Sequence, residues 1–455
     1  MTTNANNLSV AAFTALGTIV GYLGTEVASA SMFNRLLWPS RFYNTKSPMS
    51  FLWISLLMPM GGPIHKAAVE SLDEFVVAGL FKGYCRGDML GTAFYEDTKH
   101  CYVIRMPDGS KGEQKVARNA FWITVLELVG WEAAIDQPMP SPTLNDELAE
   151  RAVAQLRAQR PLFVLKLTRR SPVPIDTNMP VVEGDIGRLK LRYFAGIMAS
   201  EITTLAVGIV TAAALKSLFS IWYLYPLILK LVSLFFCVRR ETVEPRTHYL
   251  SYLFSKLIYR VLGIQEDVVE SPTERAELGC SIQHLPSTNP QIVCEVVDIS
   301  KGFFLIQGPS ELVMQFFRHY GHPIRNRRGI RGDHIRELIS MFTVVSFITV
   351  YPAALIAFIF APVTVQWVWI GYQLYTMLAM HLYRFYGGVN IGTTQESVAK
   401  ALSRHGRVCF IDHIGSQVFA YLERSMVSSV AEGRRAVESR VYQTLARTRP
   451  GDMCS

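Results

Sequence analysis

The sequence predicts a predominantly α membrane protein, with about five transmembrane helices (one N-terminal plus two hairpins) and small cytosolic α+β regions. Three observations predict this class. Half of the 455 residues are hydrophobic and only 18% are charged, against about 25% in typical globular chains. Two long segments carry almost no charge, and basic residues flank them. This composition excludes a disordered chain, a collagen and a small disulfide scaffold.

The longer uncharged segment covers residues 338–380, which contain no Asp, Glu, Lys, Arg or His. Its 43 residues suffice for two crossings of about 20 residues each. Pro362 lies near the middle, where a turn is needed. A soluble helix pair would carry a polar face, and this segment has none. The segment therefore predicts a transmembrane hairpin.

The second apolar segment covers residues 193–237, whose only charges are Glu201, Lys216 and Lys230. Lys216 and Ser217 divide it into two pieces, and each piece is long enough to cross a bilayer. A second hairpin is the natural interpretation.

The N-terminal segment predicts a retained transmembrane helix. Residues 1–25 are uncharged, and Ala28-Ser29-Ala30 resembles a signal-peptidase site. A signal peptide also needs a basic start, which this chain does not have. Gly17 and Gly21 form a G-x-x-x-G pattern, which suits close packing of membrane helices.

A further apolar stretch lies between Lys46 and His65, interrupted by Pro48, Pro59 and Pro63. Its uninterrupted core has only ten residues, which is too short to span a bilayer. We therefore expect an interfacial or re-entrant segment near residues 49–63. The full division of the chain is 1–34 (transmembrane helix), 35–190 (cytosolic α+β region with the re-entrant segment), 191–238 (hairpin), 239–336 (cytosolic region), 337–386 (hairpin) and 387–455 (cytosolic helical tail).

Basic residues predict the orientation of these segments. They cluster after the first helix, before and after the first hairpin, and before and after the second, and the opposite ends carry only Lys216. The positive-inside rule then places the N-terminus outside or in a lumen, and the large loops and C-terminus in the cytosol. The sequence does not specify the organelle. The net charge of +8 is explained by these flanks, so no nucleic-acid partner is expected.

The cytosolic regions show mixed α and β patterns. Pro161–Thr168, Gln291–Ile299 and Gly302–Gln307 predict strands, and Thr393 with Glu396 forms a helix capping box. The tail predicts a long basic amphipathic helix, with apolar residues on one face: Met426, Val430, Val437, Val441 and Leu445. Such a helix can bind an anionic lipid surface, a protein partner or the protein's own cytosolic domain.

Three ionisable residues lie within the predicted helices, where charges are costly and often functional. Glu26, Glu201 and Lys230 each lie nine residues from a flanking arginine, or roughly 13 Å along a helix. They therefore form a candidate polar layer. This layer is either a proton or cation relay or a structural element, in which Glu201 and Lys230 fix helix register or Lys230 extends to the interface.

A second polar cluster lies at the predicted membrane face and comprises His319, His322, Asp333 and His334. It matches no known motif, and the chain contains no P-loop, zinc-protease or nucleophile-elbow pattern. We therefore expect no catalytic residue, no metal and no cofactor.

The expected function is that of a polytopic, non-enzymatic membrane protein that positions cytosolic modules at a lipid bilayer. One alternative is a small-solute or proton transporter that uses the Glu26, Glu201 and Lys230 layer. Another is a membrane-embedded enzyme that acts on a hydrophobic substrate.

Overall fold

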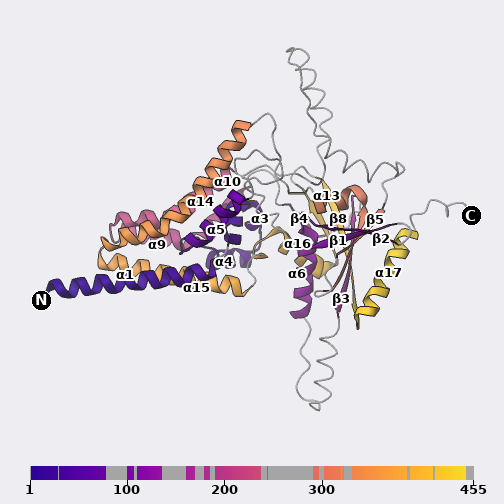
Figure 1. Ribbon diagram of the computed structural model, residues 1–455, viewed down its shortest axis with the longest axis horizontal. Helices are drawn as coiled ribbons and strands as arrows, with labels where there is room; N and C mark the ends of the chain where they lie inside the picture. The colour runs from indigo at the N-terminus through magenta and orange to yellow at the C-terminus, as the bar shows by residue number, and fades with distance from the viewer. Residues whose placement is uncertain are drawn as a thin grey trace, which may run out of the picture. The chain divides into compact units, whose positions relative to one another are not determined.

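The computed structural model describes most of the helices and strands of the chain, and the chain divides into two compact units (Figure 1). The helical unit comprises residues 1–96, 182–240 and 321–400, and the sheet unit comprises residues 97–181, 241–320 and 401–455. The described residues are 2–28, 30–77, 100–106, 110–135, 160–169, 179–184, 190–236, 243, 291–296, 302–318, 320–321, 330–386, 390–412 and 416–446.

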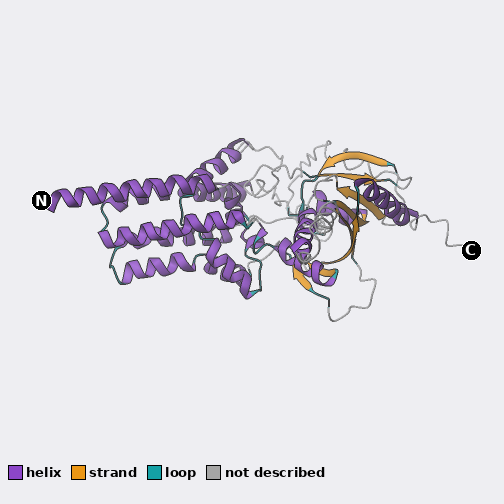
Figure 2. Ribbon diagram, turned by 90° about the horizontal axis from the view of Figure 1, so that it is seen from below, coloured by secondary structure: helices purple, strands orange, loops and turns teal. Residues whose placement is uncertain are grey.

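The helical unit consists of helices that lie side by side (Figure 2). They are α1 (Thr2–Val27), η1 (Ala30–Phe33), α2 (Asn34–Leu37), α3 (Pro39–Phe42), α4 (Pro48–Leu57), α5 (His65–Val77), α8 (Leu191–Ser200), α9 (Ile202–Ala213), η3 (Leu218–Ser220), α10 (Ile221–Phe235), α14 (Ile330–Ile359) and α15 (Val363–Phe385).

The second predicted hairpin is present as α14 and α15, which are separated at Pro362 as expected. The G-x-x-x-G pattern of α1 packs against this hairpin. A Cβ atom on Gly17 would lie 3.1 Å from Leu355, and one on Gly21 would lie 2.9 Å from Tyr351. The Tyr351 hydroxyl donates a hydrogen bond to the Gly17 carbonyl at 2.9 Å. Small residues therefore allow α1 to approach α14 closely.

Length and composition identify two helices able to cross a membrane, within Leu218–Phe235 and Met341–Ile359. The pair α8 and α9 makes a third if it forms one span. Although α15 is long enough, Gln366 and Gln373 lower its hydropathy. Both glutamines are buried and donate to backbone carbonyls inside the unit. Among its described residues, the helical unit therefore has two to three candidate spans by these criteria.

The first predicted hairpin differs from the expectation in one respect. The stretch before Lys216 was expected to be one helix, but it bends by 60° between α8 and α9. Glu201 is the residue at this break, with φ −112° and ψ 18°. The prediction of a continuous helix is therefore wrong at Glu201.

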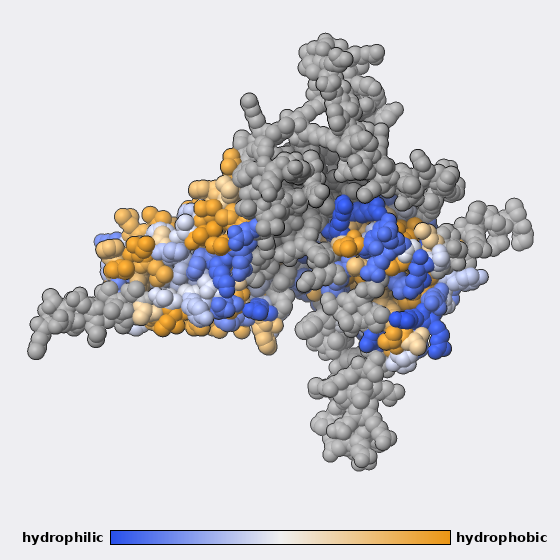
Figure 3. Space-filling view, in the orientation of Figure 1, coloured by the Kyte–Doolittle hydropathy of each residue, from blue (hydrophilic) through white to orange (hydrophobic). Residues whose placement is uncertain are grey.

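The outer surface of the helical unit carries many exposed apolar side chains, whereas the visible face of the sheet unit is largely hydrophilic (Figure 3). Exposed residues of the two hairpins include Ile209, Ile228, Phe342, Ile356 and Trp367. Water-exposed surfaces rarely present this much contiguous apolar area, so this surface is suited to lipid.

The sheet unit is built on an eight-stranded mixed sheet with the order β2-β1-β5-β6-β3-β8-β7-β4. The strands are β1 (Cys101–Arg105), β2 (Lys111–Val116), β3 (Arg160–Thr168), β4 (Val181–Glu183), β5 (Gln291–Val296), β6 (Phe303–Pro309), β7 (Arg407–Ile411) and β8 (Gln417–Val427). The strand β4 spans the boundary between the two units. The helices of this unit are α6 (Phe121–Ile135), α13 (Ser310–Arg318) and α17 (Val430–Ala446), and α16 (Thr394–His405) spans the boundary between the units.

The centre of the sheet joins three distant segments of the chain. The strand β3 pairs in parallel with β6, with Leu165 opposite Ile306, and antiparallel with β8, with Leu165 opposite Leu422. The three cytosolic segments expected from the sequence therefore form a single module. One sequence does not reveal such pairing, because it joins residues more than a hundred positions apart.

Side chains of β3 alternate between two packed faces. Leu162 and Val164 pack in one cluster with Val437 and Val441 of α17. On the other face, Phe163 stacks on Phe304 and faces α6, where a Cβ atom on Gly130 would lie 3.6 Å from the Phe163 ring. Burial of both faces is typical of a central strand in an α/β layer structure.

The C-terminal tail corrects one expectation. Residues 387–455 were expected to be helical, but β7 and β8 occupy residues 407–427, and Met426 lies in β8 rather than on a helix. The strand pair forms because β8 has β3 as a partner. The predicted capping box is confirmed at α16: the Glu396 amide donates to Thr393 Oγ1 at 3.2 Å, and the Gly392 amide donates to Glu396 Oε2 at 2.6 Å.

Candidate functional site: a buried ion pair at two helix breaks

The candidate site is the ion pair between Glu201 and Lys230, whose side chains are 0% and 1% exposed. Glu201 comes from the break between α8 and α9, and Lys230 from the middle of α10. The Lys230 Nζ atom contacts Glu201 Oε1 and donates to Ser200 Oγ and to the Met58 carbonyl, both at 3.0 Å. All three ammonium hydrogens therefore have acceptors.

The Glu201 carboxylate is equally well satisfied. Its Oε1 atom accepts a hydrogen bond from the Met60 amide at 2.9 Å, and its Oε2 atom accepts one from Thr204 Oγ1 at 2.6 Å. Thr204 Oγ1 lies 2.8 Å from the Tyr372 hydroxyl of α15. The ion pair thus links α8, α9, α10 and α15.

The second helix break lies between α4 and α5, at residues 58–64, which include Pro59, Gly61 and Pro63. Proline removes amide donors and glycine disfavours a helix, so this sequence interrupts the helix locally. The Met58 carbonyl and the Met60 amide are among the backbone groups left without helical partners, and Lys230 and Glu201 bind them. In a bilayer, non-helical backbone is tolerated only where the protein supplies such partners.

The interior packs tightly around this turn. A Cβ atom on Gly61 would lie 2.3 Å from the Tyr372 hydroxyl, and one on Gly62 would lie 2.9 Å from Thr376 Oγ1. Gln373 Nε2 donates to the Gly61 carbonyl at 3.0 Å. The turn is therefore enclosed by α15 as well as by the ion pair.

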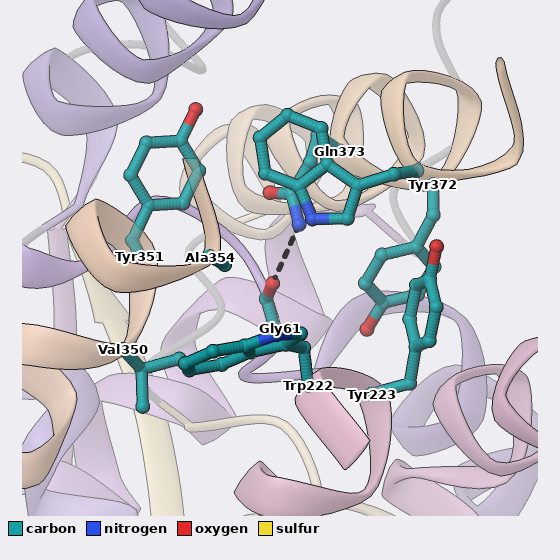
Figure 4. Close-up of a pocket in the computed structure, with 9 residues that line it drawn as sticks. Gly61, Trp222, Tyr223, Val350, Tyr351, Ala354, Tyr372 and Gln373 are labelled. Atoms are coloured by element: carbon teal, nitrogen blue, oxygen red, sulfur yellow. Dashed lines mark hydrogen bonds between the residues drawn. The ribbon is translucent and has the colours of Figure 1, made fainter. Parts of the chain in front are cut away.

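A small cavity adjoins the turn and is shown in Figure 4. Its lining is mostly aromatic and includes Trp222, Tyr351, Trp369, Tyr372 and Gln373. The cavity has room for about one water molecule. Gln373 Oε1 is buried and has no hydrogen-bond partner among the described residues, so a water molecule here would supply a donor.

The structure brings together two of the three predicted layer residues. Glu201 and Lys230 are in contact, but Glu26 is absent from their network. The Glu26 side chain is 55% exposed, and its Oε1 atom lies 3.6 Å from Lys66 Nζ. Counting residues from the flanking arginines compares positions along the helices, but it does not give the direction in which each side chain points.

The second predicted cluster has no described geometry. His319 and His322 lie outside the described residues, and Asp333 and His334 fall in the first turns of α14, whose side chains there are not described. Among the described residues, no three His, Cys, Asp or Glu side chains are close enough to hold a metal ion.

Sequence reasoning missed Ser200, Thr204, Tyr372 and the two backbone groups of the turn. One signal was available: a ten-residue apolar segment followed by closely spaced Pro and Gly implies unpaired backbone that needs polar partners. Comparison with protein-family models, with curated protein sequences and with solved structures gave no match.

Proposed function

We propose that this protein is a multi-pass membrane protein that holds one α+β module, the sheet unit, at the cytosolic face of a bilayer. The observation that carries the proposal is the pairing of β6, β3 and β8, which belong to three segments separated by the two hairpins. Paired strands must lie on the same side of a membrane. Each intervening segment, 182–240 and 321–400, therefore crosses an even number of times.

Because each of these segments crosses an even number of times, two crossings for each hairpin are favoured, which supports the five-helix arrangement. The connections inside the hairpins, at residues 214–217 and 360–362, carry only Lys216. The opposite ends carry the basic residues that the positive-inside rule places in the cytosol. The ten residues of α4 extend about 15 Å, which fits a re-entrant segment rather than a sixth crossing.

Within this proposal, the Glu201–Lys230 pair stabilises the re-entrant turn. Every polar atom of the pair has a partner from the protein itself, which favours a structural role over ligand binding. A pair of this kind fixes the position of the turn relative to α8, α10 and α15.

Labelling of introduced cysteines tests the proposed topology. Exposed positions Glu113, Glu311 and Ser439 represent the three sheet-unit segments, and Ala214 and Thr364 represent the hairpin connections. In sealed vesicles whose outer surface is the extracellular or lumenal face, a membrane-impermeant maleimide should label Ala214→Cys and Thr364→Cys above the level of the unchanged chain. The other three should react only after permeabilisation. If the three sheet-unit positions divide between the two sides, the proposal is wrong.

A second candidate function, proton transport, is favoured by one observation. Tyr372 both lines the cavity and bonds Thr204, which bonds Glu201, so a hydrogen-bonded chain runs from the cavity to a buried carboxylate. Proton flux into liposomes distinguishes the two functions. Flux that is abolished by Thr204→Val, in a variant that still folds, would support transport over a structural role.

A further inference from the structure

Arg35 of α2 is a buried cation that pairs with no acidic side chain among the described residues. It is 1% exposed, and its Nε, Nη1 and Nη2 atoms have no hydrogen-bond acceptor among the described residues. Its Cζ atom lies 3.9 Å from the centre of the Tyr383 ring, near the end of α15. The tyrosine ring is thus the observed contact of this guanidinium charge.

Two other cations among the described residues are also buried, Lys230 at 1% and Arg105 at 5% exposure, and each has a carboxylate partner. Lys230 pairs with Glu201, and Arg105 donates through Nε to Glu295 Oε2 at 2.8 Å. An arginine stays protonated in proteins and carries five N–H donors. Stacking on an aromatic ring offsets only part of the cost of burying such a charge. Within the part of the chain that the structure describes, the Arg35 site therefore has no anion.

The geometry points to a phosphate. We propose that Arg35 binds the phosphate group of an anionic membrane phospholipid, which completes this site from outside the chain. The planar guanidinium fork matches two oxygens of a phosphate. Because the side chain has several rotatable bonds, the guanidinium can turn from the ring towards the headgroup layer.

The charge of the helical unit around its basic flanks supports an anionic lipid. Lys46, Lys190 and Arg192 share a single carboxylate, that of Glu183, so positive charge is in excess there. Arg384 follows Tyr383 directly and donates to the Glu26 carbonyl at 3.4 Å. Anionic headgroups are enriched at the cytosolic leaflet. The lipid assignment rests on the proposed membrane location of this unit.

The test is a thermal-unfolding measurement on the full-length chain in neutral detergent, with and without phosphatidylglycerol. We expect the lipid to raise the melting temperature of the unchanged chain by about 5 °C at a hundredfold excess over its Kd. The Arg35→Gln variant should lose this rise. Without lipid, it should be at least as stable as the unchanged chain, because an unpaired charge is gone.

Lys66→Gln is the matched control, since it removes an exposed cation (50% exposed) from the same unit. It should keep the full rise, and Arg35→Lys should keep part of it. A full rise in Arg35→Gln would overturn the proposal. A rise with inorganic phosphate alone, abolished by Arg35→Gln, would overturn the lipid assignment in favour of a soluble phosphate.

The remaining outcomes are also decisive. If Arg35→Gln does not fold, two other measurements test the proposal: the lipid-induced rise in Arg35→Lys, and the amount of phospholipid that the purified unchanged chain retains. Absence of retained phospholipid contradicts the proposal. The cysteine-labelling pattern is independent of lipid binding. A correct topology with no lipid effect therefore rejects the Arg35 site alone.

Discussion

The Lys230 ammonium and the Glu201 carboxylate contact each other with at most 1% exposure, and each also binds one backbone group of the turn at residues 58–60. Two charged side chains on separate helices thus substitute for the helical partners that this turn lacks. This arrangement supports the proposed structural role of the pair in the helical unit.

This role predicts a strong coupling between the two residues. Lys230→Met leaves a buried carboxylate unpaired and should cost about 3–5 kcal/mol in the free energy of unfolding, and Glu201→Gln should cost a similar amount. The double variant should lose much less free energy of unfolding than the two single variants lose together. Denaturation of the purified chain in detergent measures all three, and costs that simply add would contradict the coupling.

Gly61→Ala should destabilise the helical unit by about 1–3 kcal/mol, because the new Cβ atom would lie 2.3 Å from the Tyr372 hydroxyl. Tyr372→Phe removes that hydroxyl and should recover part of the loss in the double variant. Gly371→Ala is the control, since nothing lies within 4 Å of its Cβ position. Equal effects of the two alanines would show that the close approach to Tyr372 is unimportant.

In the sheet unit, Gly433→Ala should weaken the packing of α17 on the sheet by a similar amount. The introduced Cβ atom would lie 2.1 Å from the Phe303 ring. Ser439→Ala, at an exposed position on the same helix, should change the melting temperature by little. A Gly433→Ala variant as stable as Ser439→Ala would contradict this packing.

Thiol reactivity tests the burial of the sheet. Burial raises the pKa of the Cys294 thiol to about 12, and the Cys294 side chain is fully buried. At pH 8 the thiolate is therefore scarce and inaccessible. Cys294 should react with a maleimide only after the protein unfolds. Mass spectrometry of the peptide that contains Cys294 measures this reaction. Reaction in the native protein as fast as at the partly exposed Cys101 would argue against this sheet.

Glu183 should contribute to stability in a pH-dependent way. A hydrogen bond from Lys190, with the charges of Arg192 and Lys46, lowers the pKa of this carboxyl from 4.5 to about 2. A lowered pKa means that the stabilisation is present above pH 4.5 and is lost as the pH falls towards 2. The stability difference between the unchanged chain and Glu183→Gln should therefore shrink over that range. A difference that is constant from pH 6 to pH 3 would contradict this.

Local patterns in the sequence predicted local structure. The Thr393–Glu396 spacing gave the start of α16, and the uncharged run around Pro362 gave the α14–α15 hairpin. Both depend on residues close together in the chain. The contact of Glu201 with Lys230 was one of the predicted alternatives, because a tight connection makes the two helices neighbours.

Other features depend on partners that are distant in the sequence. Residues 417–427 have an apolar pattern compatible with either a helix or a strand, and only pairing with β3 makes them a strand. The bend at Glu201 likewise reflects the turn at residues 58–60, which the carboxylate binds. One sequence cannot supply these contacts.

In the proposed topology, three segments separated by membrane hairpins form one module on one side of the membrane. The most direct test of this topology is a disulfide between Lys166→Cys of β3 and Gln307→Cys of β6, which are paired in register at a Cα separation of about 5 Å. Oxidation is carried out in native membranes, with a protease site inserted after residue 270. The two fragments should stay joined until reductant is added. The control pair is Lys166→Cys with Gln291→Cys, whose strands are two apart in the sheet, or about 10 Å. This pair should not join the fragments. Fragments that separate in both variants, with both cysteines still free, would contradict the proposed topology.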